Sequence, residues 1–150
     1  MREKVIHSAQ ALGLQVRFMR LEGLAATVEE AAGAVGCAPA RIARSLVFVA
    51  DGDPVLCITS GAHQVDLERL AGVLDVAEVR PATAGEVRAA TGFPAGGVPP
   101  FGHGLPVVLD EDLLGQGRVW ASGGDGHSVF EVAARELADC TEAIVATLGA

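Results

Sequence analysis

The chain has 150 residues, half of them apolar and a fifth charged, which is typical of a globular protein with a sizeable core. Its formal net charge of −8 opposes non-specific binding to DNA or other nucleic acid, although ten arginines against one lysine still allow a local cationic site. The sequence contains neither an apolar run as long as a membrane span nor a signal-peptide core. We therefore expect a single cytoplasmic domain over residues 1–150 that does not contact membranes.

The N-terminal part of the sequence predicts a helix, a strand and a second helix. Apolar residues at helical spacing over residues 2–12 predict a helix that a glycine ends. Alternating apolar and polar residues predict a half-buried strand over residues 15–21. Thr27 is followed three residues later by Glu30, a capping box that begins a second helix ending near Gly36.

The centre of the sequence predicts a β-hairpin that is covered on both faces. A helical turn over residues 40–43 leads to two near-continuous apolar runs, 45–50 and 54–60, which an Asp-Gly-Asp turn joins. An amphipathic helix over residues 66–74 follows. Asp66 is expected to be its N-cap rather than a catalytic carboxylate.

The remaining predicted elements are short. Thr83 and Glu86 form a second capping box, which begins a helix ending at Gly92. Strands are expected over residues 77–80, 105–109, 117–121 and 127–132, helical turns over 111–114 and 133–138, and a last short element over 142–148. Because hairpins dominate the middle of the chain, the expected fold class is α/β with a mixed, mostly antiparallel sheet curled around the central hairpin.

Residues 91–104 contain five glycines and three prolines and can form neither a helix nor a central strand. Phe93, Val98 and Phe101 are spaced through this stretch, which distinguishes it from a solvated linker. It is interpreted either as a loop that presents backbone N–H groups to a ligand or as an ordered connection between two elements. Residues 122–126 form a second flexible, glycine-rich loop.

Cysteine and histidine spacings indicate neither a disulfide framework nor a metal site. All three cysteines are expected to be buried thiols: Cys37, Cys57 and Cys140. The four histidines lack the spacing of metal ligands: His7, His63, His103 and His127. No cofactor is predicted.

Four segments occur in the order and spacing of a known family: Ile-Ala-Arg-Ser-Leu-Val-Phe at 42–48, Val-Asp-Leu at 65–67, Thr-Gly-Phe with Gly-Gly-Val-Pro-Pro-Phe-Gly-His at 91–103, and Val-Trp-Ala-Ser-Gly-Gly at 119–124. With these segments the chain resembles the YbaK/ProX family, also called the prolyl-tRNA synthetase insertion-domain-like family. The resemblance implies a sheet rolled into a partial barrel with flanking helices. It also implies the family's activity, hydrolysis of mischarged aminoacyl-tRNA by a freestanding or fused deacylase.

The resemblance points to Arg44 as a site residue, with one departure from the family. Most members have a lysine at this position, where it is the main charged residue of the pocket. An arginine stays protonated at any relevant pH, so Arg44 is expected to clamp a phosphate or polarise the ester carbonyl rather than to act as a base. The alternative is that Arg44 is an ordinary surface charge at the start of a strand.

Hydrolysis of an activated ester needs a positioned water and hydrogen-bond donors for the oxyanion. Backbone N–H groups of three glycines are the predicted donors: Gly96, Gly97 and Gly102. No Gly-x-Ser-x-Gly nucleophile motif is present. In the resembling family the terminal ribose hydroxyl of the substrate is taken to help activate the water. Substrate contacts are predicted for five further residues: Ser45, His103, Ser122, Gly123 and Gly124.

Two residues of the matching segments also have structural interpretations. His103 is as consistent with a cap of its own loop as with a pocket-lining role. Trp120 is expected in the core rather than as a stacking platform for a base.

Two functions therefore stay open. The first is a trans-editing deacylase, with Cys- or Ala-tRNA(Pro) as candidate substrates, the acceptor end of the tRNA as partner, and prolyl-tRNA synthetase as a further candidate partner. The second is a non-catalytic module of the same fold that recognises an amino acid, a nucleotide or a synthetase. The arginine at position 44 favours the second.

Overall fold

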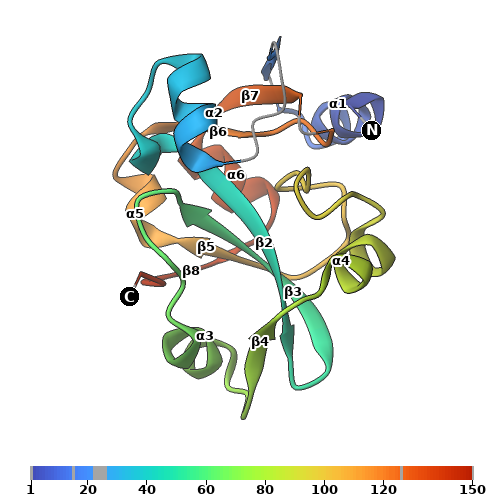
Figure 1. Cartoon of the computed structure of the whole chain (residues 1–150), viewed down its shortest axis with the longest axis vertical. Coiled ribbons are helices and arrows are strands. Elements are labelled where there is room, and N and C mark those ends of the chain that lie inside the picture. The colour runs from blue at the N-terminus through green and yellow to red at the C-terminus, as the bar shows by residue number, and fades with distance from the viewer. Residues whose placement is uncertain (1, 15, 22–26, 126, 150) are drawn as a thin grey trace.

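The computed structural model describes residues 2–14, 16–21, 27–125 and 127–149, and its strands form two sheets (Figure 1). The larger sheet contains, in spatial order, β4 (Val79–Pro81), β2 (Ala43–Ala50), β3 (Asp53–Ser60), β5 (Val107–Asp110) and β8 (Ile144–Ala146). The smaller sheet contains β1 (Arg17–Arg20), β7 (Ser128–Ala133) and β6 (Arg118–Ser122). β5 pairs in parallel with β3 and β8, and the other described pairs are antiparallel, which confirms a mixed, mostly antiparallel α/β fold.

The two sheets meet at the start of β2. Ile42, just before β2, forms a parallel bridge with Trp120 of β6. From there β2 runs through the molecule to β4, as Figure 1 shows. The expected single curled sheet is therefore two sheets in the described part of the chain, no closed barrel is formed there, and the partial barrel stays a prediction.

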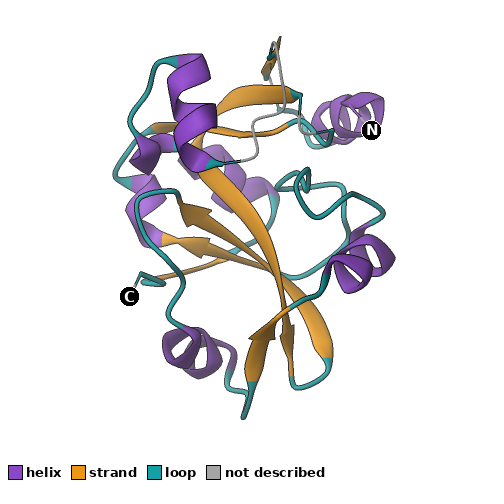
Figure 2. Cartoon of the chain, viewed as in Figure 1, coloured by secondary structure: helices purple, strands orange, loops and turns teal. Residues whose placement is uncertain are grey.

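Six α-helices and one short 3₁₀ helix are described around these sheets (Figure 2). They are α1 (Arg2–Ala11), α2 (Val28–Val35), η1 (Pro39–Arg41), α3 (Leu67–Leu74), α4 (Ala84–Thr91), α5 (Glu111–Leu114) and α6 (Ala134–Cys140). Among the described residues no helix has both the length and the apolar character needed to cross a membrane. Gln15 and Gly126, which belong to a predicted strand and a predicted loop, lie outside the described residues.

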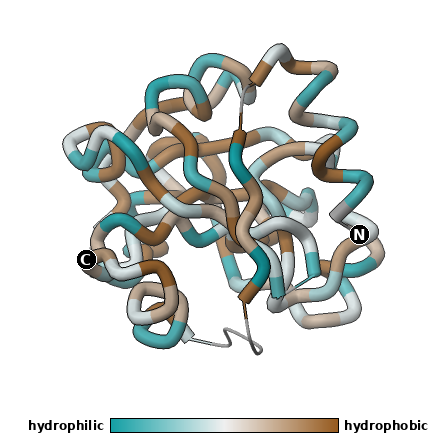
Figure 3. The backbone as a smooth tube through the Cα atoms, turned by 90° about the horizontal axis from the view of Figure 1, so that it is seen from above, coloured by the Kyte–Doolittle hydropathy of each residue, from teal (hydrophilic) through white to brown (hydrophobic). Residues whose placement is uncertain are grey.

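The central hairpin is confirmed, with β3 as the middle strand of the larger sheet. Asp51 (φ 46°) and Gly52 (φ 89°) form its turn with the positive φ values that a two-residue type I′ turn requires. Alternate residues of β3 enter two different cores: Leu56 and Ile58 pack in one, and Cys57 packs in the other. The sheet is thus buried on both faces, which explains why its strands read as continuous apolar runs. In Figure 3 hydrophobic and hydrophilic colours alternate along many of the other segments.

The predicted helix starts are confirmed by side-chain caps. The hydroxyl of Thr27 accepts from the backbone N–H of Glu30, at 3.1 Å. The second capping box is reciprocal, because Thr83 and Glu86 each accept from the other's backbone N–H. Asp66 caps α3, as expected.

The cysteine prediction is correct only for Cys57, which is fully buried and whose pKa burial raises to about 12. Cys37 and Cys140 are half-buried instead. Cys140 lies at the last turn of α6 and Cys37 in the loop after α2, so both are at the ends of helices rather than within a sheet.

Residues 91–104 form an ordered loop held by its aromatic and apolar side chains. Phe93, Val98 and Phe101 are at most 3% exposed and belong to the larger core cluster. The ring of Phe101 packs against that of Phe130 in β7, with centroids 5.5 Å apart. The loop is therefore fixed against the smaller sheet, at the place where the cavity described below opens.

Candidate functional site

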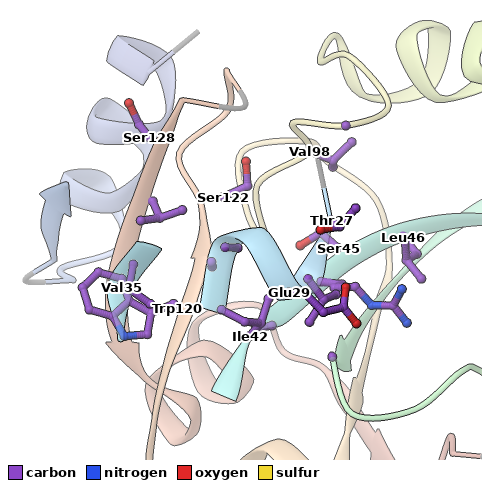
Figure 4. A pocket seen from close by; sticks show the side chains of 18 of the residues that line it. Thr27, Glu29, Val35, Ile42, Ser45, Leu46, Val98, Trp120, Ser122 and Ser128 are labelled. Atoms are coloured by element: carbon purple, nitrogen blue, oxygen red, sulfur yellow. The ribbon is translucent and has the colours of Figure 1, made fainter. Parts of the chain in front are cut away.

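A cavity of about 480 Å³ lies between α2, the start of β2, the 91–104 loop and the β6–β7 hairpin. In the view of Figure 4, Thr27, Glu29 and Ser45 group on one side, and Val35 and Trp120 lie on the other. The two sheets meet at this cavity, because Ile42 and Trp120 both line it and also form the bridge between the sheets.

The two glycine-rich loops lie side by side at this cavity. Gly96 and Val98 from the first loop and Ser122 from the second all line it, although the loops are far apart in the sequence. The two loops therefore meet at one cavity, through Gly96 and Val98 on one side and Ser122 on the other. Among the described lining residues, Gly96 is the predicted oxyanion donor that the structure brings to the cavity.

The neighbouring glycines shape the loops instead of lining the cavity. The N–H of Gly97 donates to the carbonyl of Pro94, at 2.9 Å. The N–H of Gly123 donates to the carbonyl of Ser128, at 2.7 Å, and that of Gly124 to the Ser122 hydroxyl, at 3.1 Å. The structure therefore does not bring the predicted N–H donor of Gly97, or the predicted contacts of Gly123 and Gly124, to the cavity.

Gly102 and His103 also lie outside the cavity lining. A Cβ on Gly102 would stand 2.7 Å from the hydroxyl oxygen of Ser8, so this glycine permits close packing against α1. Nδ1 of His103 accepts from the N–H of Leu105, so its Nε2 carries the hydrogen and donates to the carbonyl of Pro100. Burial lowers the pKa of His103, which favours this neutral form. His103 therefore caps its own loop, which is the structural one of its two interpretations.

Arg44 lines the cavity, and only part of its guanidinium group is hydrogen-bonded to the protein. Its position in β2 opposite Thr59 places it at the end of the hairpin, where the 61–66 loop begins. Its Nη2 donates to the carbonyl oxygen of His63, at 3.0 Å, whereas its Nε is buried without a hydrogen-bond partner in the described structure. An ordinary surface charge would have its N–H groups in solvent, so this alternative is not supported.

Three serines bring hydroxyl groups to the cavity. The Oγ of Ser45 is buried and has no hydrogen-bond partner in the described structure. The Oγ of Ser122 accepts from Gly124, so its own hydrogen remains available. The hydroxyl of Ser128 donates to Asp125, whose carboxylate shapes the second loop. Burial raises the pKa of Asp125, but hydrogen bonds from His127 and Ser128 outweigh it and keep the pKa below its usual value.

Trp120 is a cavity residue rather than a core residue, contrary to expectation. It is half-buried and lines the cavity together with apolar side chains of α2 and of the strand ends. Helix α2 itself was not predicted to take part in the site, although Thr27, Val28, Glu29, Ala31 and Val35 all line the cavity. Its sequence gives a capping signal but nothing that indicates which residues it packs against.

Two further arginines, Arg41 and Arg80, do not line the cavity. Arg80 forms two hydrogen bonds with Glu86, both 2.8 Å long, and so is engaged between β4 and α4. Arg41 is in η1, next to the cavity wall but outside the described lining. Arg44 is the one cationic side chain among the described lining residues.

One group of side chains has the composition of a metal site. His63, Asp110 and Asp112 offer three ligand atoms within 4.8 Å of one another. Nε2 of His63 lies 2.8 Å from Asp110 and 3.1 Å from Asp112, and both are hydrogen-bond distances. None of the three lines the cavity.

Comparison with known proteins identifies the family of this site. The model of the aminoacyl-tRNA editing domain matches residues 22–140. The chain belongs to this family. The matched span contains every described residue that lines the cavity.

Individual relatives include both long and short proteins. A proline–tRNA ligase of Solidesulfovibrio magneticus is 36% identical over 104 residues, which are 67% of this chain but only 18% of that ligase. The uncharacterized protein YwhH of Bacillus subtilis is 35% identical over 121 residues, covering 79% of this chain and 76% of that protein. A solved structure, described provisionally as a trans-editing enzyme for prolyl tRNA synthetase, superposes with a TM-score of 0.93 at 39% identity. The match covers 99% of this chain and 96% of the other. These likenesses support the YbaK-like deacylase family that the sequence resembles.

Proposed function

We propose that the chain acts in trans as an aminoacyl-tRNA deacylase, which hydrolyses the ester bond of mischarged tRNA in the cytoplasm. Residues 1–150 then form one editing domain. Support comes from the family match and from the similarity to a protein of nearly the same length described in the same terms.

The observation that carries the proposal is a pair of unsatisfied hydrogen-bonding atoms on one cavity wall. Nε of Arg44 and Oγ of Ser45 are both buried and have no partner in the described structure, and both residues line the cavity. A buried polar atom without a partner is unfavourable by about 1–3 kcal/mol, and at a cavity wall a water or a bound ligand can supply that partner. An ester carbonyl or a terminal phosphate offers the oxygen acceptors that a guanidinium binds best.

The reaction then needs little from the protein. Water attacks the ester carbonyl carbon, and the ribose oxygen leaves with a proton as the free amino acid forms. Arg44 remains protonated throughout, so it stabilises the developing negative charge and does not take the proton. The N–H of Gly96 is a second donor for the oxyanion, and a ribose hydroxyl of the substrate assists the water, as the resemblance to the family implies.

The cavity has room for an aminoacyl group. Its volume of about 480 Å³ must take the terminal ribose as well as the amino acid, and Val35, Val98 and Trp120 contribute to its walls. Cys- and Ala-tRNA(Pro) fit these conditions, and the similarity to proline–tRNA ligases favours tRNA(Pro) as the carrier. The acceptor end of the tRNA is the proposed partner, with prolyl-tRNA synthetase as a second one.

A second candidate function is a binding module that holds an aminoacyl group or a nucleotide without hydrolysing it. The presence of Arg44 where most family members have lysine favours it. The two functions differ in one measurement, the release of amino acid from a panel of mischarged tRNAs under multiple-turnover conditions. We expect faster release from Cys- or Ala-tRNA(Pro) than from correctly charged Pro-tRNA(Pro). Tight binding with no release above the uncatalysed rate would instead support the binding module.

A further inference from the structure

Arg44 is held by a loop that is itself fixed by a buried carboxylate. The carbonyl oxygen of His63, which accepts from Nη2 of Arg44, belongs to the loop between β3 and α3. In Figure 1 this loop leaves β3 and runs beside α5 on its way to α3. The position of this carbonyl therefore decides where the guanidinium points.

The ring of His63 attaches the loop to the end of β5. Its Nε2 lies 2.8 Å from Oδ2 of Asp110 and 3.1 Å from Oδ2 of Asp112. Because an ionised carboxylate only accepts hydrogen bonds, Nε2 carries a hydrogen and donates it. The side chain of Asp110 is fully buried, so the hydrogen bond from His63 replaces hydration that this carboxylate has lost.

The same carboxylate also fixes the two neighbouring elements. Its Oδ2 accepts from the N–H of Ser60, the last residue of β3, at 3.0 Å. Its Oδ1 accepts from the N–H of Asp112 in α5, at 3.1 Å. The His63 ring also packs closely against Gly149, where a Cβ would stand 3.1 Å from ring atoms. The loop thus has one defined position relative to β3 and β5.

We propose that the Asp110–His63 pair is a positioning element for the proposed deacylation: it fixes the His63 carbonyl and, through it, the guanidinium of Arg44 at the cavity. This inference rests on the proposed function. Neither His63 nor Asp110 lines the cavity, so they act through Arg44 and not on the substrate. With Nη2 bound to His63, Nε is the donor that remains buried and available in the described structure.

The first test compares two substitutions of His63. His63→Gln retains an amide N–H near the position of Nε2, whereas His63→Ala removes the donor. We expect His63→Ala to lower kcat/KM on the preferred mischarged tRNA about tenfold or more, since a misplacement of about 1 Å can cost about 100-fold. His63→Gln should recover most of this loss. His7→Ala, at an exposed histidine of α1, is the matched control and should leave kcat/KM unchanged.

A double-mutant cycle separates positioning from a general effect on the fold. If His63 acts through Arg44, then His63→Ala should cause no further loss of kcat/KM in an Arg44→Ala background. A general structural role would lower kcat/KM by the same factor in both backgrounds. Equal losses, or full activity of His63→Ala in the parent background, would overturn the inference.

A measurement without substrate keeps the inference separate from the proposed function. In NMR spectra the buried Nε–H of Arg44 should exchange slowly with solvent in the parent and His63→Gln proteins and faster in His63→Ala. The Nε–H of the half-exposed Arg69 is the internal control. Unchanged exchange of Arg44 in His63→Ala would overturn the inference. A parent protein with the expected exchange but no hydrolysis would support the positioning of Arg44 and refute the deacylase.

Discussion

Gly61 lies so close to Val28 that a side chain on Gly61 has no room. A Cβ at this position would stand 2.5 Å from Cγ1 of Val28 and 2.6 Å from the carbonyl oxygen of Pro39. Gly61 follows directly after β3, and both Gly61 and Val28 line the cavity. This contact therefore sets the distance between α2 and the end of the central hairpin, and with it the width of the cavity.

We predict that Gly61→Ala destabilises the protein by about 1–3 kcal/mol, because one of the two clashing atoms belongs to the backbone and cannot rotate away. Displacement of α2 should also lower kcat/KM. Urea unfolding and the deacylation assay measure the two effects. Gly72→Ala is the matched control, since Gly72 lies within α3 and a Cβ there meets nothing within 4 Å. Gly72→Ala should raise the free energy of unfolding by about 0.5–1 kcal/mol. A Gly61→Ala protein that behaves in the same way would show that the contact between Gly61 and Val28 constrains nothing.

The ion pair between Arg80 and Glu86 predicts a pH dependence of stability. Hydrogen bonds from Arg80, and after them the backbone N–H of Thr83, lower the pKa of Glu86 to about 2 from its usual 4.5. Glu86 therefore binds a proton more weakly in the folded state. The stabilisation is fully present above about pH 4.5 and is lost as the pH falls towards about 2.

The difference in the free energy of unfolding between the parent and Glu86→Gln should accordingly shrink as the pH is lowered from about 6 to about 2. Because both side chains are exposed to solvent, added salt should reduce the difference as well. Glu68→Gln is the control, since Glu68 is also in the first turn of a helix but has no ion pair in the described structure. A difference that stays constant with pH would contradict the assigned role of Glu86.

Much of the fold was predictable because its signals are local. The two caps at Thr27 and Thr83 and the turn at Asp51 each depend on residues within three positions of one another. The division into two sheets was not predictable in this way. It depends on where β6 and β7 pack, and the pairing of β7 with β1 joins residues more than 100 positions apart, such as Phe18 and Phe130.

The site was predicted in part for the same reason. Glycine content marked the loops correctly, but it cannot tell a glycine that faces a cavity, such as Gly96, from one that packs against a helix, such as Gly102. The hydrogen bond from Arg44 to His63 spans 19 positions and that from Ser60 to Asp110 spans 50. No local pattern indicates either contact, so the role of Asp110 becomes visible only in the structure.

The charge distribution predicts a weak dependence of tRNA binding on salt. The formal net charge is −8, and Arg44 is the one cationic side chain among the described residues that line the cavity, so we expect few phosphate contacts close to the site. We expect a plot of log affinity against log salt concentration with a slope between roughly −1 and −3, at about −0.9 for each duplex phosphate neutralised. A minihelix that contains only the acceptor stem is the control and should give the same slope as the full tRNA. A slope steeper than about −5, from six or more contacts, would show that the protein also binds the body of the tRNA.

The role of Arg44 is tested by its removal and by its replacement with the residue that most family members have. Arg44→Ala should lower kcat/KM by about tenfold to a few hundredfold, because hydrogen bonds to charged groups contribute about 1.5–3 kcal/mol. Arg44→Lys should retain much of the activity, since a lysine supplies the same charge. Arg69→Ala, at a half-exposed arginine of α3, is the control for loss of one positive charge. Stability should change little in all three variants, since Arg44 lies at the end of the hairpin and outside both hydrophobic core clusters. If Arg44→Ala is as active as Arg69→Ala, the guanidinium takes no part in the reaction, and Ser45 and Gly96 remain as the donors to examine.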